Sequence, residues 1–163
     1  MAKNLVLVRH AKAIPAENNI KDFDRMLNEK GMTEAMQMGN KLMSKYPNEP
    51  IFVSSSALRT LQTAQYFAEQ FKIEADKIVC RDEMYEASAR ILLNEICAFE
   101  NDWETVFLFG HNPGISYIAE NLTKESVGDF PTCGVMSILF ECHNWNEISS
   151  GIGKIQFYDF PNS

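Results

Sequence analysis

The chain has 163 residues, a length that fits one domain built around a single hydrophobic core. Hydrophobic residues make up 45% of the chain and charged residues 23%, values that exclude a disordered, collagen-like or coiled-coil protein. With 15 Lys and Arg against 22 Asp and Glu, the formal net charge is −7. Because such a surface repels a polyphosphate backbone, we expect no nucleic-acid partner.

The N-terminal segment resembles a secretion signal only superficially. Its apolar run, at residues 5–8, is short and is followed at once by Arg9 and His10. No apolar run in the chain is long enough to cross a bilayer. We therefore expect a cytoplasmic protein that does not engage a membrane.

The cysteine and histidine patterns indicate neither a disulfide nor a metal centre. The four cysteines form no CxxC pair, and their neighbours predict reduced, buried thiols at Cys80, Cys97, Cys133 and Cys142. The chain has only three histidines and no cluster of His and Cys at ligand spacing. We expect no metal and no cofactor.

Strand and helix patterns alternate along the chain. Six apolar runs predict strands, at residues 4–8, 51–54, 77–80, 105–109, 135–140 and 154–158. Four apolar stripes at helical spacing predict helices; they comprise Ala35, Met38, Leu42 and Tyr46; Leu58, Leu61, Ala64, Ala68 and Phe71; Ile91, Leu92, Ile96 and Phe99; and Ile115, Ile118, Ala119 and Leu122. Asn112 followed by Pro113 is typical of an N-cap and a first helical residue, so we expect the fourth helix to begin there.

This alternation predicts an α/β fold, a three-layer α/β/α sandwich with a mostly parallel central sheet, formed by residues 1–163 as a single domain. The runs at 5–8 and 106–109 are apolar throughout, which is typical of central strands buried on both faces. In such sheets ligands bind at the carboxyl ends of the strands. The chemistry of the protein is therefore expected where those strands end.

Three strand ends carry residues suited to binding phosphate. Arg9 and His10 follow the first strand, Arg59 lies in the first turn of the helix after the second strand, and His111 follows the fourth strand. Separately, each has a plain structural interpretation: a strand end that reaches water, a surface arginine, a hydrogen-bonded loop histidine. Together they would place two imidazoles and two guanidiniums around one anion, with arginines holding phosphate oxygens and a neutral imidazole attacking phosphorus.

These segments also carry a family resemblance. The stretches at residues 7–11 (LVRHA), 54–64 (SSSALRTLQTA) and 110–113 (GHNP) resemble the histidine phosphatase superfamily, the phosphoglycerate-mutase-like group. Within it the chain is most similar to the short SixA-type phosphohistidine phosphatases. The resemblance implies the histidine phosphatase fold, His10 as the phosphorylated nucleophile, Arg9 and Arg59 as phosphate-binding residues, and His111 as a second histidine that contacts the phosphoryl group.

Two further assignments follow from the resemblance and leave alternatives open. Residues 24–27 (DRML) are similar to a D-x-x-R-P-L-T stretch, which implies that Arg25 contacts phosphate or substrate. Met26 stands where that stretch has Pro, and Asn28 where it has Thr, so the shape of this loop is open.

The proton donor is also open. Residues 82–87 (DEMYEA) resemble the family's L-Y-E-A stretch, which makes Glu86 the first candidate and Glu83 the second. The alternative is that both are solvated loop carboxylates. A leaving imidazole, with a pKa of about 6.5, would need far less help from an acid than an alkoxide.

The predicted function is that of a phosphatase working through a phosphohistidine intermediate on phosphohistidine in proteins. The chain shows no long insertion between strands, so the pocket is expected to be open enough for a phosphorylated protein, and equally for a small phosphorylated substrate. The alternatives are a phosphatase or mutase acting on a small phosphate ester, and a non-catalytic phosphate-binding module. The sequence leaves the oligomeric state open.

Overall fold

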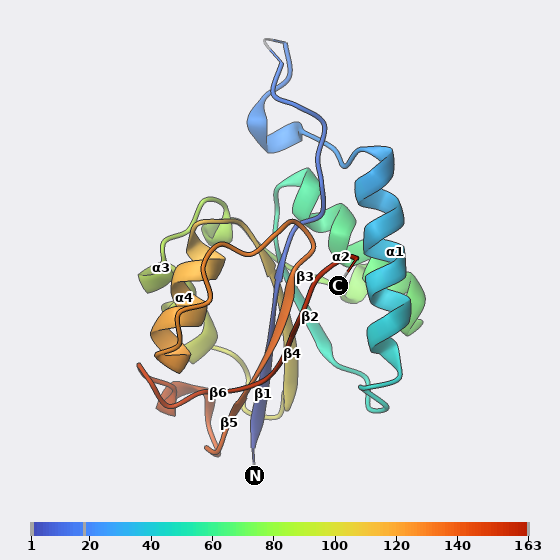
Figure 1. The fold of residues 1–163 in the computed structure, drawn as a ribbon. Coiled ribbons are helices and arrows are strands. Elements are labelled where there is room, and N and C mark those ends of the chain that lie inside the picture. The colour runs from blue at the N-terminus through green and yellow to red at the C-terminus, as the bar shows by residue number, and fades with distance from the viewer. Residues whose placement is uncertain (1, 18, 163) are drawn as a thin grey trace.

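The computed structural model describes residues 2–17 and 19–162. A six-stranded sheet forms the middle layer, in the strand order β3-β2-β4-β1-β5-β6 (Figure 1). The strands are β1 Lys3–Arg9, β2 Ile51–Ser55, β3 Val79–Arg81, β4 Thr105–Gly110, β5 Val135–Phe140 and β6 Lys154–Asp159. The pairs β1–β4, β2–β4 and β2–β3 are parallel, whereas β5 runs antiparallel to both β1 and β6. The prediction of a mostly parallel α/β sheet is confirmed.

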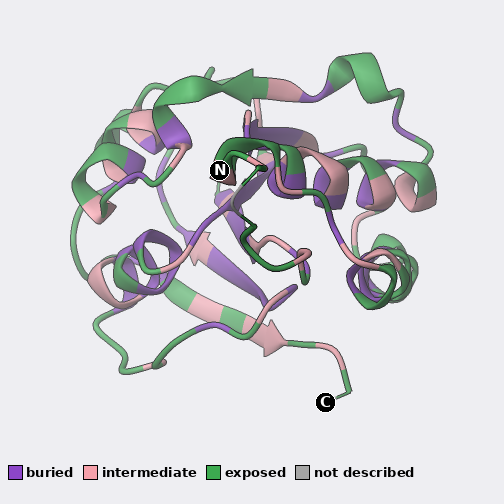
Figure 2. Ribbon diagram, turned by 90° about the horizontal axis from the view of Figure 1, so that it is seen from above, coloured by how far each residue is buried: buried purple, intermediate pink, exposed green. Residues whose placement is uncertain are grey.

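Two helices cover each face of the sheet. The α-helices are α1 Glu29–Met43, α2 Leu58–Phe71, α3 Ala89–Cys97 and α4 Gly114–Thr123. Short 3₁₀ helices are η1 Asp22–Asp24, η2 Ala75–Lys77, η3 Asp82–Met84 and η4 Trp145–Glu147. Helices α1 and α2 lie on one face, and α3 and α4 on the other (Figure 1). Seen from above, the central strands are largely buried, the edge strands β3 and β6 are more exposed, and the helices expose their outer sides (Figure 2).

Strand β1 shows why the central runs carry no polar residue. Leu5, Val6, Leu7 and Val8 are all fully buried. Leu5 and Leu7 pack with the apolar cluster under α3 and α4, while Val6 and Val8 pack with the cluster under α1 and α2. Since side chains alternate across a strand, a strand covered on both faces has to be apolar at every position.

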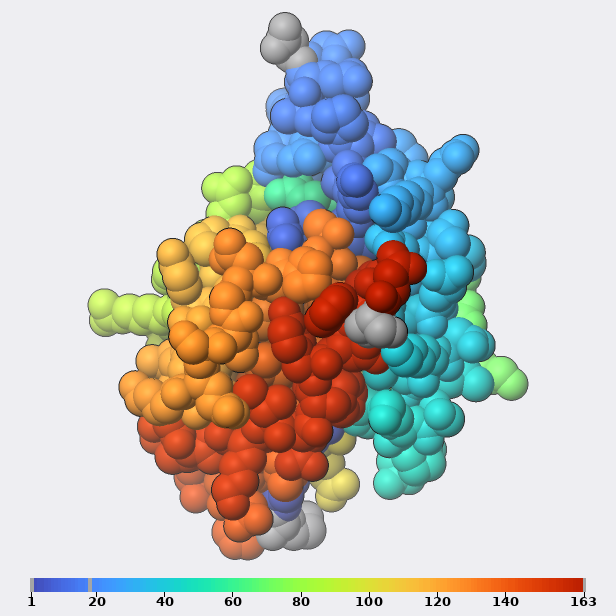
Figure 3. Space-filling model, viewed as in Figure 1, coloured from blue at the N-terminus to red at the C-terminus, as the bar shows by residue number. Residues whose placement is uncertain are grey.

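The sheet register brings the predicted site residues together. Arg9 on β1 lies opposite Gly110 on β4, and the backbone N–H of His10 donates to the carbonyl of Gly110 at 3.0 Å. His10 and His111 therefore leave neighbouring parallel strands at the same edge. The segment that follows β1 stands above this edge, in blue at the top of Figure 3.

Two predictions about local structure are wrong. Asn112 does not cap α4, which begins at Gly114 with Pro113 at the N-cap. The Asn112 side chain instead accepts a hydrogen bond from Ser116 and donates one to the carbonyl of Phe130, so its amide is already engaged. Cys80 is exposed rather than buried, because it lies on β3, a strand of three residues at the edge of the sheet.

The start of α1 resolves the open question about Asn28. Its side chain caps the helix by accepting from the backbone N–H of Gly31 at 2.8 Å. A threonine hydroxyl serves the same purpose, so the departure from the family stretch preserves the cap.

We expect Asn28→Ala to lower the free energy of unfolding by about 1 kcal/mol, because an N–H at the start of α1 would lose its acceptor. The Asn28→Thr variant should recover most of that loss. Urea unfolding followed by circular dichroism measures both. Equal stability of the alanine and threonine variants would contradict the capping role.

Candidate active site

The His10 ring is held in one tautomer by the backbone carbonyl of the next residue, Ala11. Its Nδ1 lies 2.7 Å from the carbonyl oxygen of Ala11, and because that oxygen only accepts, Nδ1 carries the proton. The other ring nitrogen, Nε2, is then an acceptor, and Arg59 Nε–H points at it from 3.4 Å. The lone pair of His10 Nε2 thus faces a guanidinium, where a phosphoryl group would find both a nucleophile and a cation.

The surroundings of His10 keep its ring neutral. Burial lowers its pKa to about 4, and the charges of Arg59, Arg9 and Arg25 act in the same direction, against an opposing hydrogen bond to Ala11. At neutral pH the Nε2 lone pair is therefore free of a proton, as a nucleophile requires.

His111 lies beside His10 at the same edge. The two ring centroids are 5.4 Å apart, and His111 is only 5% exposed. Its Nε2 lies 2.9 Å from the hydroxyl of Ser55 and 3.2 Å from that of Thr60. Burial lowers the pKa of His111 to about 3, with the nearby charges of His10 and Arg59 adding to the effect. The second imidazole is thus also neutral at pH 7.

Arg59 connects His10 to Asp22, whose side chain is more exposed. It is the second residue of α2 and is 6% exposed. Its Nη2 donates to Asp22 Oδ2 at 3.1 Å, and its Nη1 donates to the Asp22 carbonyl at 2.8 Å. Arg59 therefore presents one edge of its guanidinium, Nε and Nη2, to His10 and Asp22 together.

Two buried nitrogens of the site have no hydrogen-bond partner among the described residues. One is Nδ1 of His111 and the other is Nε of Arg9, whose Nη1 donates to the carbonyl of Phe130 at 2.7 Å. Buried polar atoms are nearly always paired, because an unpaired one costs about 1–3 kcal/mol. An anion bound against Arg9 Nε would supply the acceptor that this nitrogen lacks.

Arg25 belongs to the same network, one contact further from the nucleophile. Its Nε and Nη2 donate to the carbonyl of Ile14, and its Nη1 donates to Asp22 Oδ1 at 2.9 Å. It reaches the centre of the site through Asp22 and through its charge, which contributes to lowering the pKa of His10.

Of the two candidate proton donors, Glu86 lies at the edge of this cluster, where it interacts with the side chain of Tyr85, whereas Glu83 has no such contact in the described part of the chain. Glu86 is exposed, at a backbone φ of 52°, and Glu83 is exposed and pairs with Arg81 at 3.7 Å. Among the described residues, neither carboxylate makes a hydrogen bond or ion pair with His10, Arg9, Arg59 or His111. Proton donation by Glu86 stays a prediction.

Sequence reasoning missed Asp22 and Tyr85. The Tyr85 hydroxyl donates to Asp22 Oδ2 at 2.6 Å, and this bond, more than those from Arg25 and Arg59, holds the pKa of Asp22 well below its ordinary value. The spacing held the necessary clue: in a D-x-x-R stretch it is Asp22, and not Asp24, that stands three residues before Arg25.

The loop that carries Tyr85 is fixed against α4. A methyl group at Gly114 would overlap the carbonyl of Ala87, so only glycine permits this approach. The Tyr85 ring meets the His111 ring at 5.5 Å, which places the phenol at the edge of the site. The start of α4 thus positions both His111 and Tyr85.

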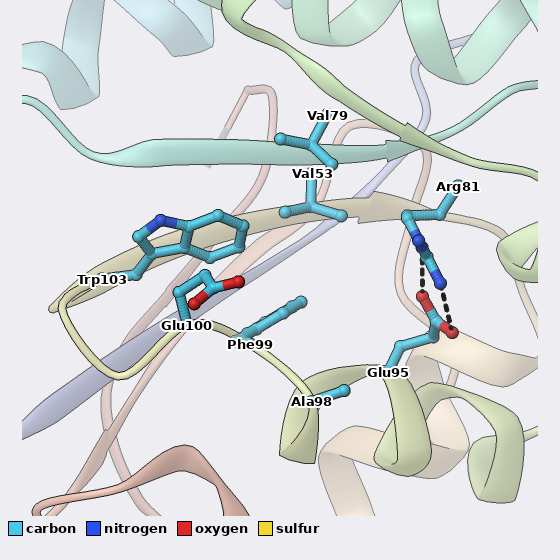
Figure 4. A pocket seen from close by; sticks show the side chains of 8 residues that line it. All are labelled: Val53, Val79, Arg81, Glu95, Ala98, Phe99, Glu100 and Trp103. Atoms are coloured by element: carbon cyan, nitrogen blue, oxygen red, sulfur yellow. Dashed lines mark hydrogen bonds and ion pairs between the residues drawn. The ribbon is translucent and has the colours of Figure 1, made fainter.

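A separate hollow of about 180 Å³ lies under the β2–β3 edge of the sheet. Val53, Val79, Phe99 and Trp103 line it, and the ion pair between Arg81 and Glu95 lies at one side (Figure 4). None of the five predicted catalytic side chains borders it, so it is not part of the site around His10. Within residues 2–17 and 19–162, no group of three or more His, Cys, Asp and Glu is placed to hold a metal ion.

Within the same part of the chain, every helix is too short or too polar to cross a bilayer.

Residues 5–90, more than half of the chain, match the family described as Histidine phosphatase superfamily (branch 1). The chain therefore belongs to the histidine phosphatase superfamily, as its motifs predicted.

Solved structures of similar sequence and fold include SixA proteins. The candidate phosphohistidine phosphatase SixA from Agrobacterium tumefaciens is 30% identical, with a TM-score of 0.82 and 98% of each chain covered. A corresponding SixA protein from Nakamurella multipartitia is 26% identical, with a TM-score of 0.85 over 100% of this chain and 98% of that one. A protein histidine phosphatase SixA solved with tungstate, at 19% identity and a TM-score of 0.82, shares the fold.

Curated proteins with similar sequences are named for a different substrate, a sugar phosphate. Lipopolysaccharide core heptose(II)-phosphate phosphatase of Escherichia coli O139:H28 is 29% identical over 120 residues, 72% of this chain. The match covers 56% of that relative, so this chain spans little more than half the length of the curated proteins it matches.

The low pKa values of both histidines predict unusual titration. We expect the rings of His10 and His111 to stay neutral from pH 8 down to about 5.5 and to protonate only as the pH approaches about 4 and 3. Since the unfolded chain binds these protons near pH 6.5, folding stability should fall on acidification from about pH 6.5 toward pH 4. NMR titration of the ring carbon-bound protons tests this. An inflection of His10 near pH 6.5 would contradict it.

Proposed function

We propose that this chain is a phosphatase that takes a phosphoryl group onto His10 and passes it to water, and that its substrate is phosphohistidine in proteins. The observation that carries the proposal is the arrangement around His10. A neutral ring nitrogen with its lone pair facing Arg59 lies beside a buried arginine donor and a second buried imidazole. We further propose that residues 1–163 act as one domain.

In the first step the phosphoryl oxygens lie against Arg9, Arg59 and His111. His10 Nε2 attacks phosphorus in line, the new N–P bond forms, and the bond to the leaving atom breaks with its electron pair going to that atom. The proton stays on His10 Nδ1 throughout, where it donates to the carbonyl of Ala11. The guanidiniums offset the charge on the equatorial oxygens.

In the second step water attacks the phosphorus of phospho-His10. The N–P bond breaks, its electron pair returns to Nε2, and the proton lost by water goes to solvent or phosphate. For an ester substrate the leaving oxygen also needs a proton, and Glu86 is the residue we propose for that role. A leaving imidazole needs far less help of this kind, which favours phosphohistidine at a site whose carboxylates are either exposed or held ionised.

A second candidate function is hydrolysis of a small phosphate ester such as a sugar phosphate. It is favoured by the 29% identity to the heptose(II)-phosphate phosphatases. The two candidates share His10, Arg9, Arg59 and His111 and differ in the leaving group.

A substrate comparison separates these functions. The protein would be incubated with a phosphohistidine-bearing peptide, a phosphoserine peptide, hexose and heptose phosphates, and 3-phosphoglycerate, with phosphate release and 2-phosphoglycerate measured. We expect the largest kcat/KM on the phosphohistidine peptide. Preference for a sugar phosphate would favour the second candidate, 2-phosphoglycerate would indicate a mutase, and phosphate binding without turnover of any substrate would indicate a binding module.

A further inference from the structure

A carboxylate, Asp22, shares one guanidinium edge with the nucleophile. Arg59 donates through Nε toward His10 Nε2 at 3.4 Å and through Nη2 to Asp22 Oδ2 at 3.1 Å. These two nitrogens form the planar edge with which arginine binds an oxyanion. A group transferred to His10 along this edge would therefore pass directly beside the Asp22 carboxylate.

Asp22 is fixed at this place by three neighbouring side chains. Its Oδ1 accepts from Arg25, its Oδ2 accepts from Tyr85 at 2.6 Å as well as from Arg59, and its backbone carbonyl accepts a second bond from Arg59. Such a set of bonds keeps the carboxylate ionised and oriented. Because these hydrogen bonds restrain Asp22 from several directions, we expect it to stay in place when substrate binds.

The position of Asp22 is on the outer side of the site. Its side chain is 41% exposed, whereas that of Arg59 is 7% exposed. In an in-line transfer the leaving group lies on the side of phosphorus opposite the nucleophile. Here that is the solvent-exposed side of the site. Asp22 is thus on the side from which the leaving group departs.

Two aromatic side chains, Tyr85 and Phe23, lie next to Asp22 on this exposed side of the site. The Tyr85 ring meets the His111 ring at 5.5 Å and the Phe23 ring at 5.1 Å, and Phe23 is 38% exposed. A planar leaving group would meet ring edges and faces here, with the carboxylate beside it. This combination suits a ring that carries an N–H.

We propose that Asp22 is the residue that selects the leaving group: its carboxylate accepts the N–H of the unphosphorylated ring nitrogen of a phosphohistidine and thereby favours that substrate over phosphate esters. The inference rests on the proposed function, because it concerns the substrate of that same site.

The step balances without an added acid. The substrate ring enters in its protonated, cationic form, with the proton on its unphosphorylated nitrogen donated to Asp22, whose negative charge favours that form. As His10 Nε2 bonds to phosphorus, the substrate N–P bond breaks and its electron pair stays on the ring nitrogen, so that a neutral imidazole with one N–H leaves. A phosphate ester instead turns an oxygen lone pair toward Asp22 and gains nothing from it.

The test compares Asp22→Asn with Asp24→Asn, a matched control that removes the same charge from the same short helix at an exposed position. The substrates are a phosphohistidine peptide and p-nitrophenyl phosphate, whose leaving group has no N–H. For Asp22→Asn we expect kcat/KM to fall about 10-fold or more on the peptide and to stay within about threefold on the ester. Asp24→Asn should leave both values unchanged.

Tyr85→Phe provides a second measurement if the Asn variant folds poorly, since it keeps the ring and removes only the hydroxyl, which donates to Asp22 and also interacts with Glu86. Like Asp22→Asn, it should lower the peptide-to-ester ratio of kcat/KM.

Equal losses of kcat/KM on both substrates would overturn the inference and leave Asp22 a structural residue. Equal gains would overturn it too, because Asp22 would then be a competitor for Arg59. A wild-type protein that neither hydrolyses the peptide nor forms a phosphoenzyme would refute the proposed function itself, an outcome visible before any variant is made.

Discussion

Replacing His10 by alanine is expected to lower kcat/KM by at least about 10³-fold and to abolish the phosphoenzyme, because it removes the neutral ring nitrogen that faces the guanidinium edge of Arg59. The remaining arginines would still bind phosphate. The loss should therefore fall on kcat rather than on the affinity for inorganic phosphate, which isothermal calorimetry reports separately.

The matched control for His10 is the third histidine of the chain. His143 is exposed in the loop after β5, and His143→Ala should keep the wild-type rate. An active His10→Ala variant, or an equal loss in both variants, would remove His10 from the nucleophile's role.

The Arg59→Ala variant is expected to lose about 10²–10³-fold in kcat/KM. The guanidinium contacts His10, the proposed nucleophile, and would hold the phosphoryl group in the proposed complex, so its removal would take away positive charge beside the phosphate oxygens. Arg59→Lys should recover only a small part of the loss, since an ammonium group lacks the planar edge with two parallel donors.

Arg90, exposed on α3, provides the control for Arg59. Arg90→Ala removes the same charge from the protein surface and should leave kcat/KM unchanged. If lysine at position 59 restored full activity, the bidentate geometry would be irrelevant, and Arg59 would act only through its charge.

The fold was predictable because its strongest patterns are local. Apolar runs without polar interruption mark β1 and β4, and both proved to be central strands covered on two faces. The parallel pairing then required that residues following those strands share one edge. The proximity of His10 and His111, at 5.4 Å, follows from these two facts.

The parts that could not be predicted depend on contacts across long stretches of chain. Asp22 meets Arg59, 37 residues away, and Tyr85, 63 residues away. The D-x-x-R spacing can single out Asp22, but its contacts with Arg59 and Tyr85 depend on how the segment between β1 and α1 packs against the edge of the sheet.

The tautomer of His10 could not be predicted from the sequence either. It is set by the carbonyl of Ala11, a backbone group that every residue possesses. The predicted helix start at Asn112 was wrong for a similar reason. The Asn112 side chain bonds to Ser116 and Phe130, and a capping pattern in the sequence does not reveal these contacts.

The central claim is that phosphate passes through His10 Nε2, and mapping the trapped intermediate tests it most directly. The protein would be mixed with phosphohistidine peptide, quenched in alkali within the first turnover and digested, and the site of the added phosphoryl group located by mass spectrometry. We expect it on the peptide containing His10, stable in alkali and lost in acid. Phosphate on His111, on an acidic side chain or on no residue while turnover proceeds would contradict the account.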